Sequence, residues 1–305
     1  MTDVEVRSFS NYGTELVTID VGPEKTAFHI HKGILTSESP YFKAAFDGEF
    51  REATEKRIHL ADTTSAIFQD FMDWLYFGSL PDGEVSEDPG STHEETNCCF
   101  CEGPYRRPPG HANSPFATLS VDDDKELEDY LIRYPQRNYK LYIFADSYDI
   151  PALRKKIVDC EYCRYRLYSD NLPWNTDYVY ALRNLPTTSM LVKLLVDLYV
   201  DRHEAEDLEY RCGTEILLQG KFPPEFLSMV IDVHSALKRK SDQKALKTLC
   251  VYHEHPQGHS VIQACVDAQK AGRDKRRAAL EVEELEVGGI GVENLEVEDK
   301  HEAGS

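Results

Sequence analysis

Residues 15–31 place apolar and polar side chains in alternation over two short runs, and this pattern constrains the fold more than any other. The first run is ELVTIDV at 15–21, and the second is KTAFHIH at 25–31, after a turn that begins at Gly22-Pro23. Alternation in β-rich runs is typical of strands, so we expect a β-hairpin. The short run RIHLAD at 57–62 predicts a further strand.

Helical spacing of apolar residues follows the hairpin. Ser39-Pro40 fits a helix start, with Ser39 as N-cap and Pro40 at the first helical position. A long helix is predicted over 64–77, with a capping group in Asp62-Thr63-Thr64 and an end at Gly78. Helical pieces are also predicted within 140–162, which is broken at Asp149-Ile150-Pro151, at 178–185, at 188–201 and after Pro223-Pro224.

The net charge of −20 is concentrated in two stretches of the 305-residue chain. Residues 82–129 hold 13 acidic and 3 basic residues, and residues 281–305 hold 9 acidic residues against Lys300. Segments rich in charge, Pro, Gly and Ser cannot bury enough apolar surface to fold, so we expect disorder at 81–125 and in the charged tail at 266–305. Because the rest of the chain is close to neutral, no direct nucleic-acid binding is expected.

The chain is expected to be soluble and intracellular, in the cytoplasm, the nucleus or both. The segment MTDVEVRSFS at 1–10 lacks the features of a secretory signal, and no apolar run is long enough to span a membrane. The eight cysteines are therefore interpreted as thiols or metal ligands rather than disulfides.

No catalytic residues and no enzymatic activity are predicted. The sequence lacks GxGxxG, GxxxxGK[ST], GxSxG and HExxH motifs. The abundant carboxylates follow the distribution of solvated loops.

One stretch rich in Cys and His is a candidate zinc site, and no other cofactor is expected. Cys250-x-x-His253-x-His255 is followed by His259 and Cys265, and the candidate ligands are Cys250, His253, His255 and Cys265. Zn²⁺ prefers tetrahedral sets of S and N ligands. The alternative is a polar connector with surface histidines. Cys98, Cys99 and Cys101 lack a standard zinc spacing, and Cys160-x-x-Cys163 is expected to be structural.

The motifs together resemble the BTB/POZ family. The resemblance is carried by HIHKGILTSESPYFKAAFDGEFREATEKRIHL, FQDFMDWLYFGSL and LYIFADSYDIPALR. It implies an α+β fold, a small mixed sheet flanked by a cluster of helices, followed by an all-α extension. The expected domains are a tail at 1–14, the BTB/POZ domain at 15–165 with an insertion at 81–125, the extension at 166–265 and the acidic tail at 266–305. The later helices are similar to those of uncharacterised BTB proteins of filamentous fungi.

The resemblance implies a protein–protein interaction module that self-associates as a homodimer and docks on a cullin scaffold of ubiquitin ligases as a substrate adaptor. The alternative is a transcription or chromatin-associated regulator with nuclear protein partners. Position by position, the cullin-facing candidates are Phe71, Asp73, Tyr76, Asp146 and Tyr148. The dimer candidates are Leu16, Val17, Ile34, Tyr41 and Phe42. The family pattern also implies that His31 is a packing histidine at the corner between strand and helix.

Overall fold

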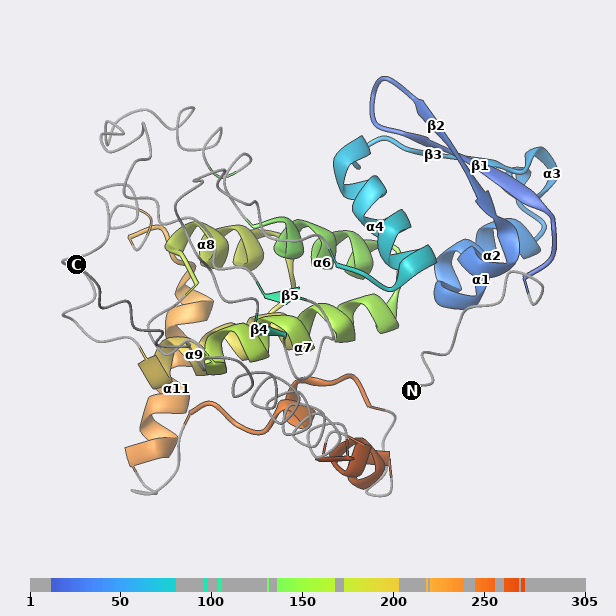
Figure 1. The fold of residues 1–305 in the computed structure, drawn as a ribbon. Helices are drawn as coiled ribbons and strands as arrows, with labels where there is room; N and C mark the ends of the chain where they lie inside the picture. The colour runs from blue at the N-terminus through green and yellow to red at the C-terminus, as the bar shows by residue number, and fades with distance from the viewer. Residues whose placement is uncertain are drawn as a thin grey trace, which may run out of the picture. The chain divides into compact units, whose positions relative to one another are not determined.

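The computed structural model describes residues 12–80, 96–97, 104–105, 131, 136–167, 173–202, 218, 220–238, 245–255, 261–268 and 270–271. The chain divides into two compact units, Met1–Pro256 and Gln257–Ser305. Every element labelled in Figure 1 belongs to the first unit.

A three-stranded mixed sheet forms the start of the first unit. It consists of β1 (Leu16–Val21), β2 (Thr26–His31) and β3 (Arg57–Leu60), in the order β2-β1-β3. β1 pairs antiparallel with β2 and parallel with β3. Directly opposite residues share a face of a sheet, so Ile19 on β1 lies on the same face as Phe28 and Ile58. This face of the sheet packs against the hydrophobic core. The predicted hairpin and the predicted third strand are both confirmed.

Four helices accompany the sheet: α1 (Lys32–Glu38), α2 (Pro40–Asp47), α3 (Arg51–Glu55) and α4 (Ser65–Phe77). Ser39 caps α2 as predicted, since its Oγ accepts a hydrogen bond from Phe42 N at 3.1 Å. Thr64 caps α4 in the same way through Ile67 N at 3.3 Å. Gly78 ends α4 with a left-handed φ of 71°, which a residue without Cβ adopts at little cost.

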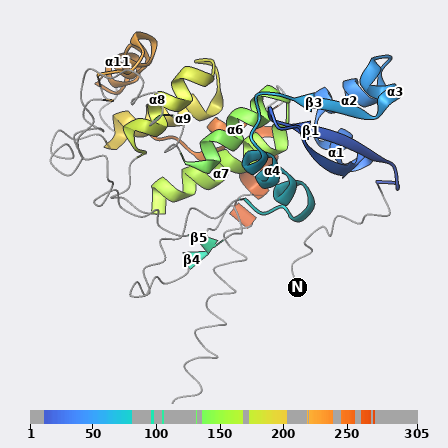
Figure 2. The ribbon, with the colours of Figure 1, turned by 90° about the horizontal axis from the view of Figure 1, so that it is seen from above.

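Aromatic side chains join the sheet to the helices that follow it. α4 lies between the sheet and α6 (Arg137–Ser147), as Figures 1 and 2 show. The ring centroids of Phe28 and Phe68 are 4.8 Å apart, and those of Phe71 and Phe144 are 5.0 Å apart. These contacts connect β2 to α4 and α4 to α6.

An ion pair strengthens the contact between α4 and α6. Arg137 donates hydrogen bonds to both carboxylate oxygens of Asp70, with Nε at 3.0 Å from Oδ2. Asp70 is buried, and burial raises the pKa of its carboxyl group although Arg137 opposes the shift. A buried carboxylate needs such a partner, because an uncompensated charge in the interior is costly.

The described residues of the first unit also form α7 (Pro151–Leu167), α8 (Asn175–Asn184), α9 (Met190–Arg202), α11 (Pro224–Lys238) and the 3₁₀ helix η4 (Leu249–Tyr252). The predicted break between two helical pieces is confirmed. Asp149 adopts a left-handed φ of 44°, and Pro151 begins the next helix. The rings of Tyr178, Phe222 and Phe226 pack together with centroids 5.0 to 5.7 Å apart, and they join α8 to α11.

Most of the predicted insertion and acidic tail lies outside the described residues. Within the insertion, β4 (Thr96–Asn97) pairs antiparallel with β5 (Pro104–Tyr105). In the second unit, residues 261–268 and 270–271 are helical, so helix extends past position 266, where the tail was expected to begin. The domain limits drawn from the sequence stay a prediction.

Among the described residues, no helix is long and apolar enough to cross a membrane.

Candidate functional site

Tyr76, on the last turn of α4, contacts the end of β2. Its Oη accepts a hydrogen bond from His31 N at 3.1 Å and lies 3.0 Å from His31 Nδ1. The two rings meet edge to face, with centroids 6.0 Å apart. His31 therefore packs at the strand–helix corner, where the family resemblance put it, and Tyr76 is its partner.

The other cullin-facing candidates differ in their exposure. Phe71 is completely buried and belongs to the core, so it cannot touch a partner in this conformation. Asp73 is half-buried and accepts a hydrogen bond from Gln69 Nε2 at 3.1 Å, one helical turn away. Asp146 is also half-buried, and burial raises the pKa of its carboxyl group.

Tyr148, the last of that set, packs at the N-terminus of α2. Its ring stacks on Phe42 with centroids 5.5 Å apart, and its Oη lies 3.3 Å from Thr63 Oγ1. Ser39 Oγ donates a hydrogen bond of 2.6 Å to Tyr148 O. Tyr148 therefore ties the end of α6 to α2, and burial raises the pKa of its hydroxyl.

The five dimer candidates separate into a surface group and a core group. Leu16 is 50% exposed and Tyr41 is 41% exposed. Val17, Ile34 and Phe42 are at most 1% exposed and form part of the core. Only the first two can touch a second subunit directly.

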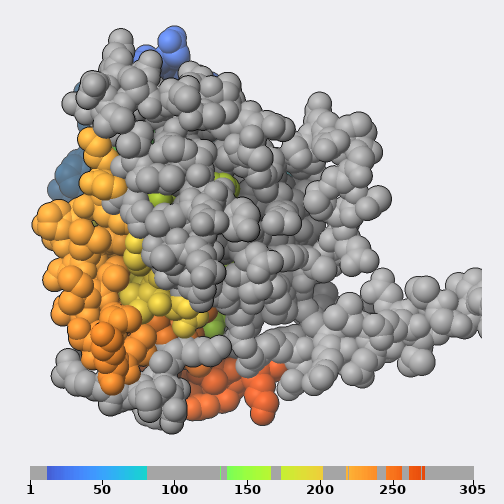
Figure 3. All heavy atoms as spheres, turned by 90° about the vertical axis from the view of Figure 1, so that its left-hand side faces the viewer, coloured from blue at the N-terminus to red at the C-terminus, as the bar shows by residue number. Residues whose placement is uncertain are grey.

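Further apolar side chains reach solvent at positions that were not among the candidates. Phe77 is 79% exposed at the end of α4, and Phe50 is 61% exposed before α3. On α11, Leu227 and Ile231 are 45% and 63% exposed. Figure 3 shows the atoms of α11, in orange, on the face toward the viewer. Periodicity identifies the buried stripe of a helix, but it does not indicate which apolar residues lie beyond the edge of that stripe.

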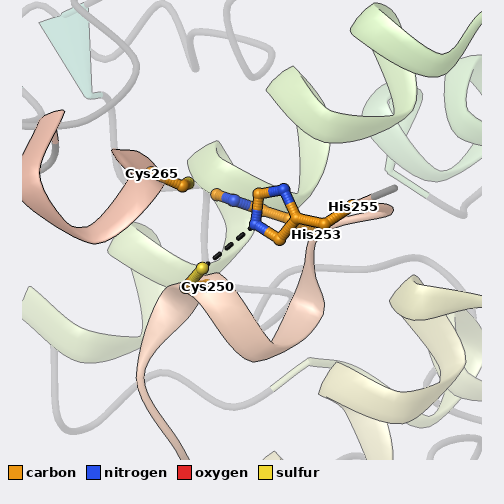
Figure 4. Close-up of side chains that lie close together, drawn as sticks. All are labelled: Cys250, His253, His255 and Cys265. Atoms are coloured by element: carbon orange, nitrogen blue, oxygen red, sulfur yellow. Dashed lines mark hydrogen bonds between the residues drawn. The ribbon is translucent and has the colours of Figure 1, made fainter. Parts of the chain in front are cut away.

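Three of the four candidate zinc ligands meet around η4 in the first unit. The ligand atoms of Cys250, His253 and His255 lie within 4.8 Å of one another. Cys250 Sγ is 3.0 Å from His255 Nε2, the contact dashed in Figure 4. Cys250 and His253 are buried, and burial lowers the pKa of His255. Cys265, the fourth candidate, is half-buried and belongs to the second unit.

The segment 249–255 is held by side chains of α7 and α9. His253 Nε2 makes a short hydrogen bond to Asp159 Oδ1 on α7. Tyr252 Oη donates to Asp197 Oδ2 on α9 at 2.8 Å. These partners come from helices far away in the sequence, and no sequence motif indicated them.

A neighbouring ion pair adds to this attachment. Arg154 on α7 donates to both carboxylate oxygens of Glu254, at 2.7 and 2.6 Å, and to Ala145 O at 3.2 Å. The side chain of Arg154 is only 10% exposed. The bidentate geometry fixes the direction of the chain between the two histidines.

Comparison with known proteins identifies the N-terminal part of the chain. Residues 14–89 match the model of the BTB/POZ domain family. Among similar proteins, Kelch-like protein 38 of Danio rerio is 38% identical over 50 residues, which are 16% of this chain and 9% of that protein. Kelch-like protein 30 of Homo sapiens is 40% identical over 50 residues, again 16% and 9%. TD and POZ domain-containing protein 3 of Mus musculus is 35% identical over 54 residues, 18% of this chain and 15% of that protein.

These alignments span less than one sixth of each relative's length. They agree with the fold, because the matched range holds the three-stranded mixed sheet and α1 to α4. Residues 14–89 therefore form a BTB/POZ domain, a protein-interaction domain, and the chain continues into a helical C-terminal region.

Proposed function

We propose that this chain is a homodimeric adaptor that uses its BTB/POZ domain to self-associate and to dock on a cullin scaffold. The observation that carries the proposal is the exposure of Leu16 and Tyr41, two positions that the BTB/POZ resemblance assigns to the dimer contact. A surface leucine and tyrosine gain free energy when a second copy covers them. A twofold contact would use the same patch on both subunits.

The oligomeric state of the purified chain tests self-association. Light scattering coupled to size-exclusion chromatography should give a dimer for the wild type and a monomer for Leu16→Asp/Tyr41→Asp, because two carboxylates would be desolvated in each subunit's half of the contact. The matched control is Leu227→Asp on α11, since Leu227 has nearly the same exposure as Leu16. A monomeric wild type would contradict the dimer, and equal disruption by the control would contradict the assignment of the contact to Leu16 and Tyr41.

The cullin contact is proposed to use α4 and the end of α6. Asp73 and Tyr76 are half-buried on α4, and Asp146 and Tyr148 are half-buried at the end of α6. Phe77 adds an aromatic side chain that is 79% exposed, the kind of residue that anchors protein interfaces. The names of the Kelch-like relatives identify no binding partner. The cullin contact is therefore supported by the family resemblance and by the exposure of Phe77.

Pull-down with a panel of cullins tests the adaptor role. Phe77→Ala and Asp73→Lys should each weaken binding about tenfold or more, as expected for anchor residues. Phe50→Ala is the control, since Phe50 is also exposed but lies outside the proposed contact. Tyr76→Phe separates a role of the Oη bonded to His31 from a role of the ring. A dimer that binds no cullin would contradict the adaptor and favour the nuclear regulator.

A further inference from the structure

A cysteine and two histidines converge on one small volume beside η4, and their distances fit a zinc ion. With Zn–S of about 2.3 Å and Zn–N of about 2.0 Å, a tetrahedral site separates its S and N ligands by about 3.5 Å. The distance between Cys250 Sγ and His255 Nε2 is 3.0 Å, and all three ligand atoms lie within 4.8 Å of one another. Small shifts of these side chains would bring the three ligand atoms to coordination distance.

The contact of His253 with Asp159 is a second, independent observation, and it is the contact expected of a metal-binding histidine. A histidine ligand usually donates its other ring N–H to a carboxylate, which fixes the tautomer and orients the ring. Asp159 holds the Nε2 atom of His253 in this way. Nδ1 is then the nitrogen that would coordinate the ion.

Hydrogen bonds position the backbone around Cys250 and His253 without a metal ion. Cys250 and His253 lie on the same 3₁₀ turn, and the N–H of His253 donates to Cys250 O. Tyr252 is fixed by Asp197 and Glu254 by Arg154, so each residue flanking His253 has its own anchor. A metal site needs ligands that are held near their final geometry by such supporting contacts.

We propose that Cys250, His253 and His255 bind one Zn²⁺ ion as a structural site. Cys265, taken from the sequence alone, is the predicted fourth ligand. Two thiolates and two neutral imidazoles would balance the charge of the ion, as in Cys₂His₂ sites. The ion would cross-link Cys250, His253 and His255 within the segment 249–255. The contact of His253 with Asp159 would link that segment to α7.

Metal analysis of the full-length chain decides the question. Protein produced with zinc and dialysed against zinc-free buffer should retain about one ion per chain. Cys250→Ser and His255→Gln should lose it. Cys160→Ser and His234→Gln are the matched controls, because they remove the same residue types from α7 and α11 and should retain the ion. Wild-type protein with almost no zinc would overturn the proposal.

Two further measurements test whether a variant loses zinc because it misfolds, and whether other cysteines bind the ion. Replacement of zinc by Co²⁺ should give the visible absorption of a tetrahedral ion and a thiolate charge-transfer band, and Cys250→Ser should abolish that band while its circular dichroism stays native. The combined change of Cys98, Cys99 and Cys101 to Ser should retain the ion, and loss of the metal there would move the site away from η4. Cys265→Ser should also lose zinc, and full retention would remove Cys265 from the ligand set.

Discussion

Ser39 has two functions in the structure. Its Oγ caps α2 through Phe42 N and donates to Tyr148 O, 109 positions later in the chain. Ser39→Ala is expected to lower the free energy of unfolding by about 2 kcal/mol, from the loss of the cap and of a partly buried hydrogen bond. Chemical denaturation measures this. Thr64→Ala removes a cap alone and should cost about 1 kcal/mol, and an equal cost for both variants would show that the contact with Tyr148 contributes nothing.

Asp20 makes the stability of the sheet depend on pH. Arg57 donates two hydrogen bonds to its carboxylate, at 2.5 and 2.8 Å, and these hold the pKa of Asp20 below its usual value. A carboxyl group with a lowered folded-state pKa contributes stability above its unfolded pKa, about 4, and this is lost as the pH falls through the folded value. Asp20→Asn should therefore flatten the acid limb of a plot of unfolding free energy against pH. An unchanged acid limb would contradict this role.

At the scale of elements, the attachment of η4 depends in part on Arg154 of α7. Arg154→Met should lower the free energy of unfolding by about 2 kcal/mol, less than for a fully buried pair because Glu254 is 36% exposed. Hydrogen exchange of residues 249–255 should become faster, while that of β1 to β3 stays unchanged. Arg51→Met, at an exposed ion pair on α3, is the control and should change neither. Unchanged exchange in Arg154→Met would show that the contacts of Tyr252 and His253 hold the segment without Arg154.

The sequence predicts those elements that are governed by local rules. Ser39, Pro40, Gly78 and Pro151 mark helix ends through capping and fixed backbone angles, and each prediction agrees with the structure. The partners of His31 and His253 were not predictable, since Tyr76 and Asp159 lie 45 and 94 positions away in sequence. Burial on a helix edge also escaped prediction, because Tyr76 is half-buried and Phe77 is exposed although they are neighbours.

At the scale of the molecule, the first unit is expected to unfold as one. The chain has two tryptophans, Trp74 on α4 in the BTB/POZ domain and Trp174 at the start of α8. In Trp174→Phe the remaining tryptophan is Trp74, so the fluorescence reports on the BTB/POZ domain. In Trp74→Phe the remaining tryptophan is Trp174, so the fluorescence reports on the helical region. Within each variant, the fluorescence transition in denaturant should coincide with that of far-UV circular dichroism. Separate midpoints would mean that the helical region is an independent folding unit.

The pairing of Asp70 with Arg137 affects how freely the length of the sequence between α4 and α6 can change in evolution. The two residues are 67 positions apart, yet their helices touch, so both ends of the intervening sequence are fixed by the core. The entropy lost on closing such a connection grows only with the logarithm of its length, and doubling it costs roughly 0.6 kcal/mol. Sequence can therefore be gained or lost between α4 and α6 at little cost in chain entropy, provided that Asp70 and Arg137 keep their pairing.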